Sequence, residues 1–302
     1  MGEYFVALAG TESGERLALI LALFSAFAHA VFAALNKQGL DPYLNRGAIN
    51  VAYSVMAAPF ALFVFPLPEG FLIPVLFASF VMHVAYEWMQ SAAFSKGAFT
   101  LVYPIARGTG PLITALLAIS VFSENLEWGQ WAGMLLLSGA IISLAGINLQ
   151  EKGLSEQLKA ALLPSILLAI GAGIAVALYT TVDAYGIRVT ADPFTFLSWF
   201  FFLGGFGFPV IAYARWKKME TKPPVRPLVI RGFTGASIAF VSFATLMLAT
   251  RIGKVSEAAA LRETSIIFAT GIGVIFFREH VSPIKLLVIG LIACGAVLVE
   301  FG

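Results

Sequence analysis

The chain has 302 residues, of which 59% are hydrophobic and 12% are charged, and its formal net charge at pH 7 is +2. Because ordinary soluble domains carry about 25% charged residues, this composition excludes a water-soluble globular protein and indicates an integral membrane protein. The small net charge, with basic residues mostly between apolar segments, gives no indication of a nucleic-acid partner.

Ten apolar segments are long enough to cross the lipid bilayer as helices, for which roughly 20 residues are needed. We predict membrane-spanning helices over approximately 17–36, 47–66, 71–94, 98–122, 129–149, 161–183, 193–214, 229–250, 255–277 and 282–301. These segments use most of the chain, so we expect an all-α integral membrane protein with ten transmembrane helices and no separate soluble domain.

Polar side chains recur on one face of several predicted spans. In the third span Ser79, His83, Glu87 and Gln90 are spaced by 4, 4 and 3 residues, which places them on one helical face. Lipid cannot satisfy such groups. We therefore expect spans 1, 3, 4, 6, 8 and 9 to surround a central cavity, and spans 2, 5, 7 and 10, which are more uniformly apolar, to form the outer wall.

Two arginines lie well inside predicted spans and begin similar patterns. Arg107 precedes Glu124 by 17 residues (124 − 107), and Arg262 precedes Glu279 by the same 17 (279 − 262). A charge near the bilayer centre costs about 2.5 to 3.5 kcal/mol even on the mildest scale, so each arginine indicates a functional site.

The repeated pattern predicts an internal duplication, with a first repeat over residues 1–155 and a second over 156–302. Five spans per repeat is an odd number, so the second copy must enter the membrane from the other side. We expect two inverted five-helix repeats around a central cavity, the architecture of many secondary transporters, with the substrate site between the repeats.

The basic residues predict the orientation. Those expected on one side are Lys37, Arg46, Lys96, Lys152, Lys159, Arg215, Lys217, Lys218, Lys222, Arg226, Arg231, Arg278 and Lys285, and those expected on the other are Arg16, Arg188, Arg251 and Lys254. Cytoplasmic loops carry the excess of Lys and Arg. The connection around 215–231 is therefore predicted to be cytoplasmic and both termini extracytoplasmic, in a prokaryotic inner membrane.

The predicted substrate site is a set of polar and aromatic side chains on the expected cavity faces: Arg107, Arg262, Glu87, His83, Tyr103, Tyr179, Asp183, Glu263, Ser242, Thr245, His29, Asn36 and Tyr86. The guanidinium groups suit a carboxylate or a phosphate of a ligand. In the alternative interpretation, Arg107 and Arg262 pair internally with Glu87 and Glu263. Glu87 and His83 are candidates for proton coupling, and the tyrosines form an aromatic wall or simply pack in the core.

The stretch Tyr103–Pro111 contains two prolines and two glycines around Arg107, which predicts either an interrupted helix that exposes backbone carbonyls or a packing kink. Cys294 is the single cysteine, and we predict that it is a small core residue within an apolar span. We find no zinc-protease motif, nucleophile elbow or Gly-rich phosphate loop, so we expect no enzyme activity, metal or cofactor.

The motifs resemble those of a known family. Tyr103-Pro-Ile-Ala-Arg-Gly-Thr-Gly-Pro111 with Phe122-Ser-Glu124 resembles the first-repeat signature of the drug/metabolite transporter superfamily, EamA type. Leu261-Arg-Glu-Thr-Ser265 with Phe277-Arg-Glu279 resembles the second-repeat signature, and Tyr179-Thr-Thr-Val-Asp183 a motif of the sixth helix. The resemblance implies a ten-helix basket that moves small metabolites by alternating access, often outward. It also implies cavity-lining helices that carry Arg107, Arg262, Glu87, Tyr179 and Asp183.

We therefore expect a secondary active transporter, more an exporter than an importer, for a small polar, zwitterionic or anionic organic substrate, with proton coupling as a further hypothesis. One alternative is a flippase for a lipid-linked head group, which needs a lateral opening between helices. A different class is a non-transporting membrane sensor or assembly subunit. The sequence does not distinguish a monomer from an oligomer.

Overall fold

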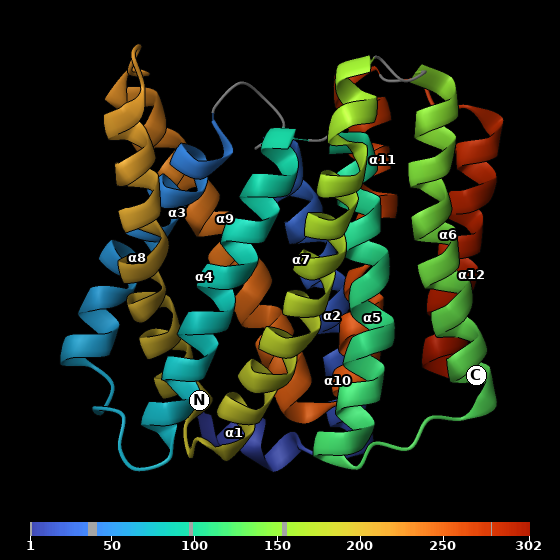
Figure 1. Ribbon diagram of the computed structural model, residues 1–302. Coiled ribbons are helices and arrows are strands. Elements are labelled where there is room, and N and C mark those ends of the chain that lie inside the picture. Colours follow the sequence, from blue (N-terminus) through green and yellow to red (C-terminus); the bar gives the residue numbers. More distant parts are fainter. Residues whose placement is uncertain (1, 36–40, 97–98, 153–155, 279) are drawn as a thin grey trace.

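The computed structural model describes residues 2–35, 41–96, 99–152, 156–278 and 280–302, and all regular structure in these ranges is helical (Figure 1). The helices are α1 (Gly2–Leu8), α2 (Glu12–Leu35), α3 (Pro42–Phe63), α4 (Leu72–Lys96), α5 (Phe99–Phe122), α6 (Trp128–Lys152), α7 (Glu156–Val189), α8 (Pro193–Lys218), α9 (Val225–Ile252), α10 (Val255–Arg262), α11 (Ser265–Phe277) and α12 (Pro283–Phe301). The predicted all-α fold is thus confirmed.

Nine stretches of the described chain are long and apolar enough to span a membrane, with α10 and α11 counted together as one. The prediction of ten differs in one helix, α3, which corresponds to the predicted span 47–66. Its first turns carry Arg46 and Asn50, which lower its hydropathy. Those two residues have buried partners inside the bundle, as described below.

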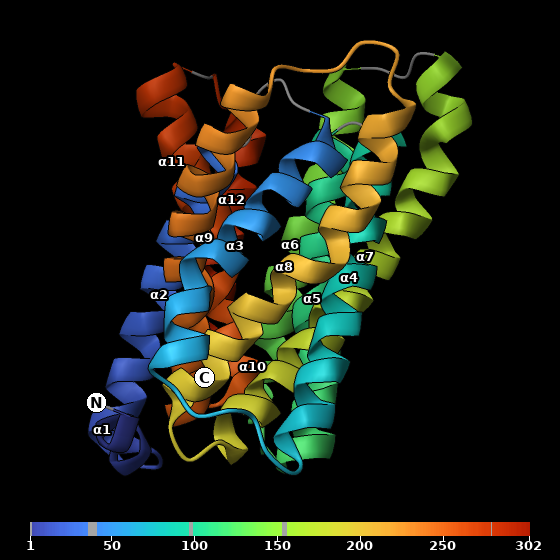
Figure 2. The ribbon, with the colours of Figure 1, turned by 90° about the vertical axis from the view of Figure 1, so that its left-hand side faces the viewer.

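The long helices form one bundle in which segments distant in sequence pack side by side (Figures 1 and 2). The most extensive contacts are those of α3 with α8, α6 with α12, α4 and α5 with α7, and α2 with α9. Gly133 and Gly295 allow the close approach of α6 and α12, since a Cβ on either would lie under 3 Å from the other's carbonyl oxygen. Both chain ends lie at the same end of the bundle, where α1 runs across it (Figure 1).

The helix interruption is in the second half of the chain and not where the prolines predict it. α5 is continuous through Pro104 and Pro111. Membrane helices tolerate proline where neighbouring groups and local adjustments satisfy the freed backbone. In contrast, α10 ends at Arg262 and α11 begins at Ser265, without any proline or glycine between them. The interrupted helix expected at Tyr103–Pro111 is therefore wrong, and the packing kink is the remaining interpretation of that stretch.

Candidate functional site

The two intramembrane arginines lie near one carboxylate, that of Glu263, in the bundle interior. Arg107 on α5 and Arg262 at the end of α10 are 5% and 2% exposed, and both line a small cavity together with Glu263. Arg107 Nε is 2.8 Å from Glu263 Oε2, and Arg107 Nη2 donates to Ser265 Oγ over 3.5 Å. The break between α10 and α11 places Glu263 and Ser265 where Arg107 can reach both.

Arg262 has a different environment. Its guanidinium carbon lies 4.4 Å from the centre of the Phe243 ring, and its Nε, like that of Arg107, has no hydrogen-bond partner. Within the described chain no carboxylate lies at ion-pair distance from Arg262. A buried cation is normally paired, because leaving it alone costs several kcal/mol. An anionic ligand would therefore stabilise Arg262 more than any other charged group in this site.

Glu87 on α4 is paired with a residue that the sequence analysis assigned to a loop. Its Oε1 lies 3.6 Å from Arg46 Nε, and its Oε2 accepts a hydrogen bond of 2.7 Å from Asn50 Nδ2, both on α3. The hypothetical pairing of Glu87 with Arg107 or Arg262 is thus wrong. The placement of span 2 in an outer wall is also wrong, since α3 contributes Arg46 and Asn50 to the interior.

The spacing of residues in the sequence indicates that Arg46 and Asn50 belong to one polar helix face. Residues 46, 50 and 53 are spaced by 4 and 3, and Tyr53 is the third member of this polar face. The predicted start of span 2 at residue 47 left Arg46 outside the helix. The structure begins α3 five residues earlier, at Pro42, where the Asp41 side chain accepts hydrogen bonds from the backbone of Tyr43 and Leu44.

A third polar group joins α4 to α7. His83 Nε2 is 2.8 Å from Asp183 Oδ2, and Ser79 Oγ donates to the other oxygen of Asp183. The His83 ring stacks on Tyr179 with ring centres 4.1 Å apart, and Tyr86 packs edge-on against the same tyrosine at 5.1 Å. These predicted site residues on α4 and α7 therefore form one continuous cluster.

A cavity lies beside these groups. It is lined by polar residues of α3 and α4 and by aromatic residues of α8 and α9, among them Arg46, Asn50, His83, Glu87, Phe200 and Phe243. Its volume is about 40 Å³, which is room for roughly three water molecules. An organic metabolite does not fit without movement of the walls, so this conformation is closed around the polar groups.

Other predicted residues lie outside this cluster. Ser242 on α9 and Ser25 on α2 exchange hydrogen bonds, each hydroxyl donating to the other's carbonyl oxygen over 2.9 and 2.7 Å. Thr245 donates to the carbonyl of Val241 in its own helix. These two hydroxyls serve helix packing and their own backbone.

The remaining candidates are His29 and Tyr103, which have ring contacts, and Asn36. The His29 ring is 6.0 Å from Phe32 on the same helix, and the Arg107 guanidinium lies 6.0 Å from the Tyr103 ring. Asn36 and Glu279 lie outside the described residues.

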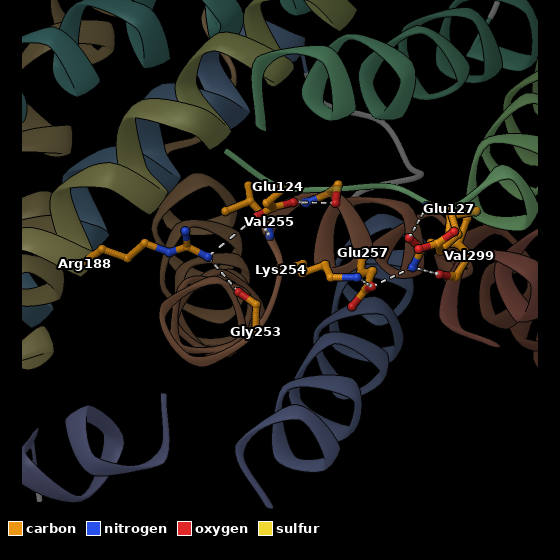
Figure 3. A network of polar contacts seen from close by, with 10 residues as sticks. Glu124, Glu127, Arg188, Gly253, Lys254, Val255, Glu257 and Val299 are labelled. Carbon is orange, nitrogen blue, oxygen red and sulfur yellow. Dashed lines mark hydrogen bonds and ion pairs between the residues drawn. The ribbon is translucent and has the colours of Figure 1, made fainter. Parts of the chain in front are cut away.

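A second polar network lies at the end of the bundle that holds the termini (Figure 3). Glu124, just after α5, accepts hydrogen bonds from the backbone of Val255 and Ser256 over 2.6 and 3.1 Å and from the Ser256 hydroxyl over 2.5 Å. It therefore caps α10, in the other half of the chain.

Two arginines complete this terminal network by capping each other's helices. Arg188 at the end of α7 donates to the carbonyls of Thr250 and Gly253 at the end of α9, both over 2.7 Å. Arg251 at the end of α9 donates in turn to the carbonyls of Ile187 and Arg188. Arg188 also lies 3.8 Å from Glu124. The last carbonyl groups of α7 and α9 thus accept hydrogen bonds from positively charged side chains, which suit the negative end of each helix dipole.

The network continues along the start of α10 to α6 and α12. Gln130 donates to Glu257 over 2.8 Å and to the Val299 carbonyl over 3.0 Å, and Lys254 lies 2.8 Å from Glu257 (Figure 3). Burial alone would lower the pKa of Lys254, but the hydrogen bond and charge of Glu257 outweigh it, so the pKa is raised. A cavity of about 740 Å³ opens beside these groups.

Comparisons with known proteins agree with this architecture. Residues 163–301 match the model of the EamA-like transporter family. No curated protein matches the chain. A crystal structure of a protein with 17% sequence identity superposes with a TM-score of 0.69 and covers 96% of this chain and 98% of its own. At that identity the likeness concerns the fold alone.

The apolar helices and the family match together define a multi-pass integral membrane protein. The family match confirms the predicted resemblance to EamA-type members of the drug/metabolite transporter superfamily for the second half of the chain, which holds the motifs Tyr179–Asp183 and Leu261–Ser265.

Proposed function

We propose that the protein is a secondary active transporter for a small polar organic metabolite with a carboxylate or phosphate group, which it moves by alternating access. The observation that carries this proposal is the buried, unpaired Arg262 beside the Arg107–Glu263 ion pair. A ligand anion would complete the set of charges, whereas a purely structural network would pair every cation internally.

The proposal includes two inverted repeats, residues 1–155 and 156–302. The helix contacts support it. In this correspondence α2 is equivalent to α7, α3 to α8, α4 to α9, α5 to α10 and α11 together, and α6 to α12. Helix α3 then packs on its own counterpart α8, and α6 packs on its counterpart α12. The contact of α2 with α9 likewise corresponds to that of α7 with α4. Arg107 and Arg262 then occupy equivalent positions that meet at the interface of the repeats, where transporters of this architecture bind substrate.

The orientation we propose puts the end opposite the termini in the cytoplasm. That end carries the connection between α8 and α9, with Lys217, Lys218 and Lys222 (Figure 1). The terminal network around Glu124 then lies at the extracytoplasmic end. Glu87 and His83 face the same small cavity, which supports their proposed role as proton-coupling groups.

The proposal is tested by ligand binding followed by transport. Purified protein is screened by thermal shift against amino acids, organic acids, sugar phosphates and amines, because a ligand that binds only the folded state raises the melting temperature. The best ligand is then measured in proteoliposomes by counterflow. We expect a ligand with a carboxylate or phosphate group, and at least a tenfold loss of its counterflow in Arg262→Gln. Counterflow that is unchanged in Arg262→Gln would refute the proposed anion site.

A further inference from the structure

Phe243 stands between the cavity and the unpaired arginine. Its ring lines the cavity together with His83 and Glu87, and it also covers the Arg262 guanidinium at 4.4 Å. Arg262 itself lines a separate small cavity, with Arg107 and Glu263. The two cavities share no lining residue. A third small cavity adjoins both, since it shares Phe243 with the first and Thr180 and Leu246 with the second. Phe243 therefore lines the way from the Glu87 side toward Arg262.

The backbone at Phe243 is held in place by its neighbour. Ser242 and Ser25 exchange hydrogen bonds with each other's carbonyl groups, which fixes α9 against α2 at this level. The Phe243 ring, in contrast, has no hydrogen-bonding group: it lies 6.1 Å from the His83 ring and 6.4 Å from the Tyr179 ring, and it covers the Arg262 guanidinium. A turn about the side-chain bonds of Phe243 can therefore uncover Arg262 while the helix stays where it is.

We infer that Phe243 is a specificity-determining residue that shields Arg262 until the anionic group of a ligand displaces its ring. The inference rests on the proposed function, because it assigns a ligand anion to Arg262. In the shielded state the ring face stabilises the guanidinium through a cation–π contact. A carboxylate or phosphate forms stronger, charge-assisted hydrogen bonds with the same group, so it can replace the ring. A neutral ligand of similar shape offers no such compensation.

The shielding is tested without any transport measurement. Purified protein in detergent is treated with phenylglyoxal, which modifies accessible arginines, and the modification of Arg262 is followed by peptide mass spectrometry. We expect at least a tenfold faster modification in Phe243→Ala than in the unchanged protein, and an intermediate rate in Phe243→Leu, which keeps an apolar side chain and is the milder variant for folding. Gel filtration confirms that each variant is folded.

Phe240→Ala is the matched control. Phe240 lies one turn earlier on α9 and its ring stacks on Phe201 at 3.9 Å, whereas the ring over Arg262 is that of Phe243. Removing it should leave the rate at Arg262 within twofold of the unchanged protein. Equal rates in the Phe240 and Phe243 variants would overturn the inference, as would unchanged reactivity in both Phe243 variants.

A second arm separates this inference from the proposed function. Acetate and inorganic phosphate are used as anionic probes, with glycerol as a neutral one, and protection of Arg262 in Phe243→Ala is measured. Protection by the anions alone supports an anion site behind the ring. Faster modification of Arg262 without protection by either anion would preserve the shielding by Phe243 but refute the anion site, and with it the specificity role.

Discussion

The two buried polar regions of this protein differ in how completely their charges are satisfied. In the terminal network Glu124 accepts three hydrogen bonds, and Arg188 and Arg251 each donate to carbonyls of the opposite helix. In the central site Arg107 is paired with Glu263, but Arg262 faces an aromatic ring. A satisfied network mainly stabilises one arrangement of helices. An incomplete one keeps a capacity for binding, at a cost in stability.

The largest effect on stability is expected from Arg107→Ala. This variant leaves Glu263 buried without its partner, which typically costs about 3 to 5 kcal/mol. The apparent melting temperature in detergent should fall sharply. The double variant Arg107→Ala with Glu263→Gln should recover much of the loss, because it removes the uncompensated charge. A single variant as stable as the unchanged protein would show that the pair is not formed.

Glu124→Ala should have the next largest effect. It removes the cap of α10 and leaves two backbone N–H groups and a serine hydroxyl without this acceptor, for an expected loss of about 2 kcal/mol. Glu127→Ala, a nearby residue that is more exposed, is the control. Thermal unfolding of the two variants side by side measures the difference. If both unfold at the same temperature, the cross-chain cap does not stabilise the fold.

Arg262→Gln should change stability by less than about 1 kcal/mol, because removal of a buried charge without an ion pair is offset by loss of its cation–π contact with Phe243 and of its attraction to Glu263. It should therefore be as stable as the unchanged protein, or slightly more so, while it loses ligand binding. The combination of a retained melting temperature and an absent ligand-induced shift distinguishes this variant from Arg107→Ala. A large loss of stability would mean that Arg262 has a structural partner.

Glu12→Gln is expected to have the smallest effect of all. Glu12 pairs with Arg16 over 2.5 Å on the surface of α2, with both side chains more than three-quarters exposed. Solvent screens such pairs, and their contribution to stability is often not measurable. The melting temperature should stay within one measurement error of the unchanged protein. A clear decrease would show that surface pairs in this bundle are not a neutral reference for the buried ones.

The sequence predicted the spans well, because the length of an apolar run reports directly on the thickness of the bilayer. It predicted partners poorly, since these depend on how each helix is rotated against its neighbours. Arg46 was assigned to a loop although it approaches Glu87, because the predicted helix began at residue 47, five residues after the start of α3 at Pro42. Glu124 caps α10, and nothing in the local sequence around Glu124 indicates that partner. The sequence has no proline or glycine at the helix break after Arg262, so the break could not be predicted from it.

The exchange of arginines between the ends of α7 and α9 has a mechanical consequence. The arginine at the end of each helix binds the last carbonyl groups of the other helix. Movement of either helix end alone would therefore break hydrogen bonds to the carbonyl groups of both. The two tips should therefore part in a single all-or-none event, or else travel together as one rigid lever.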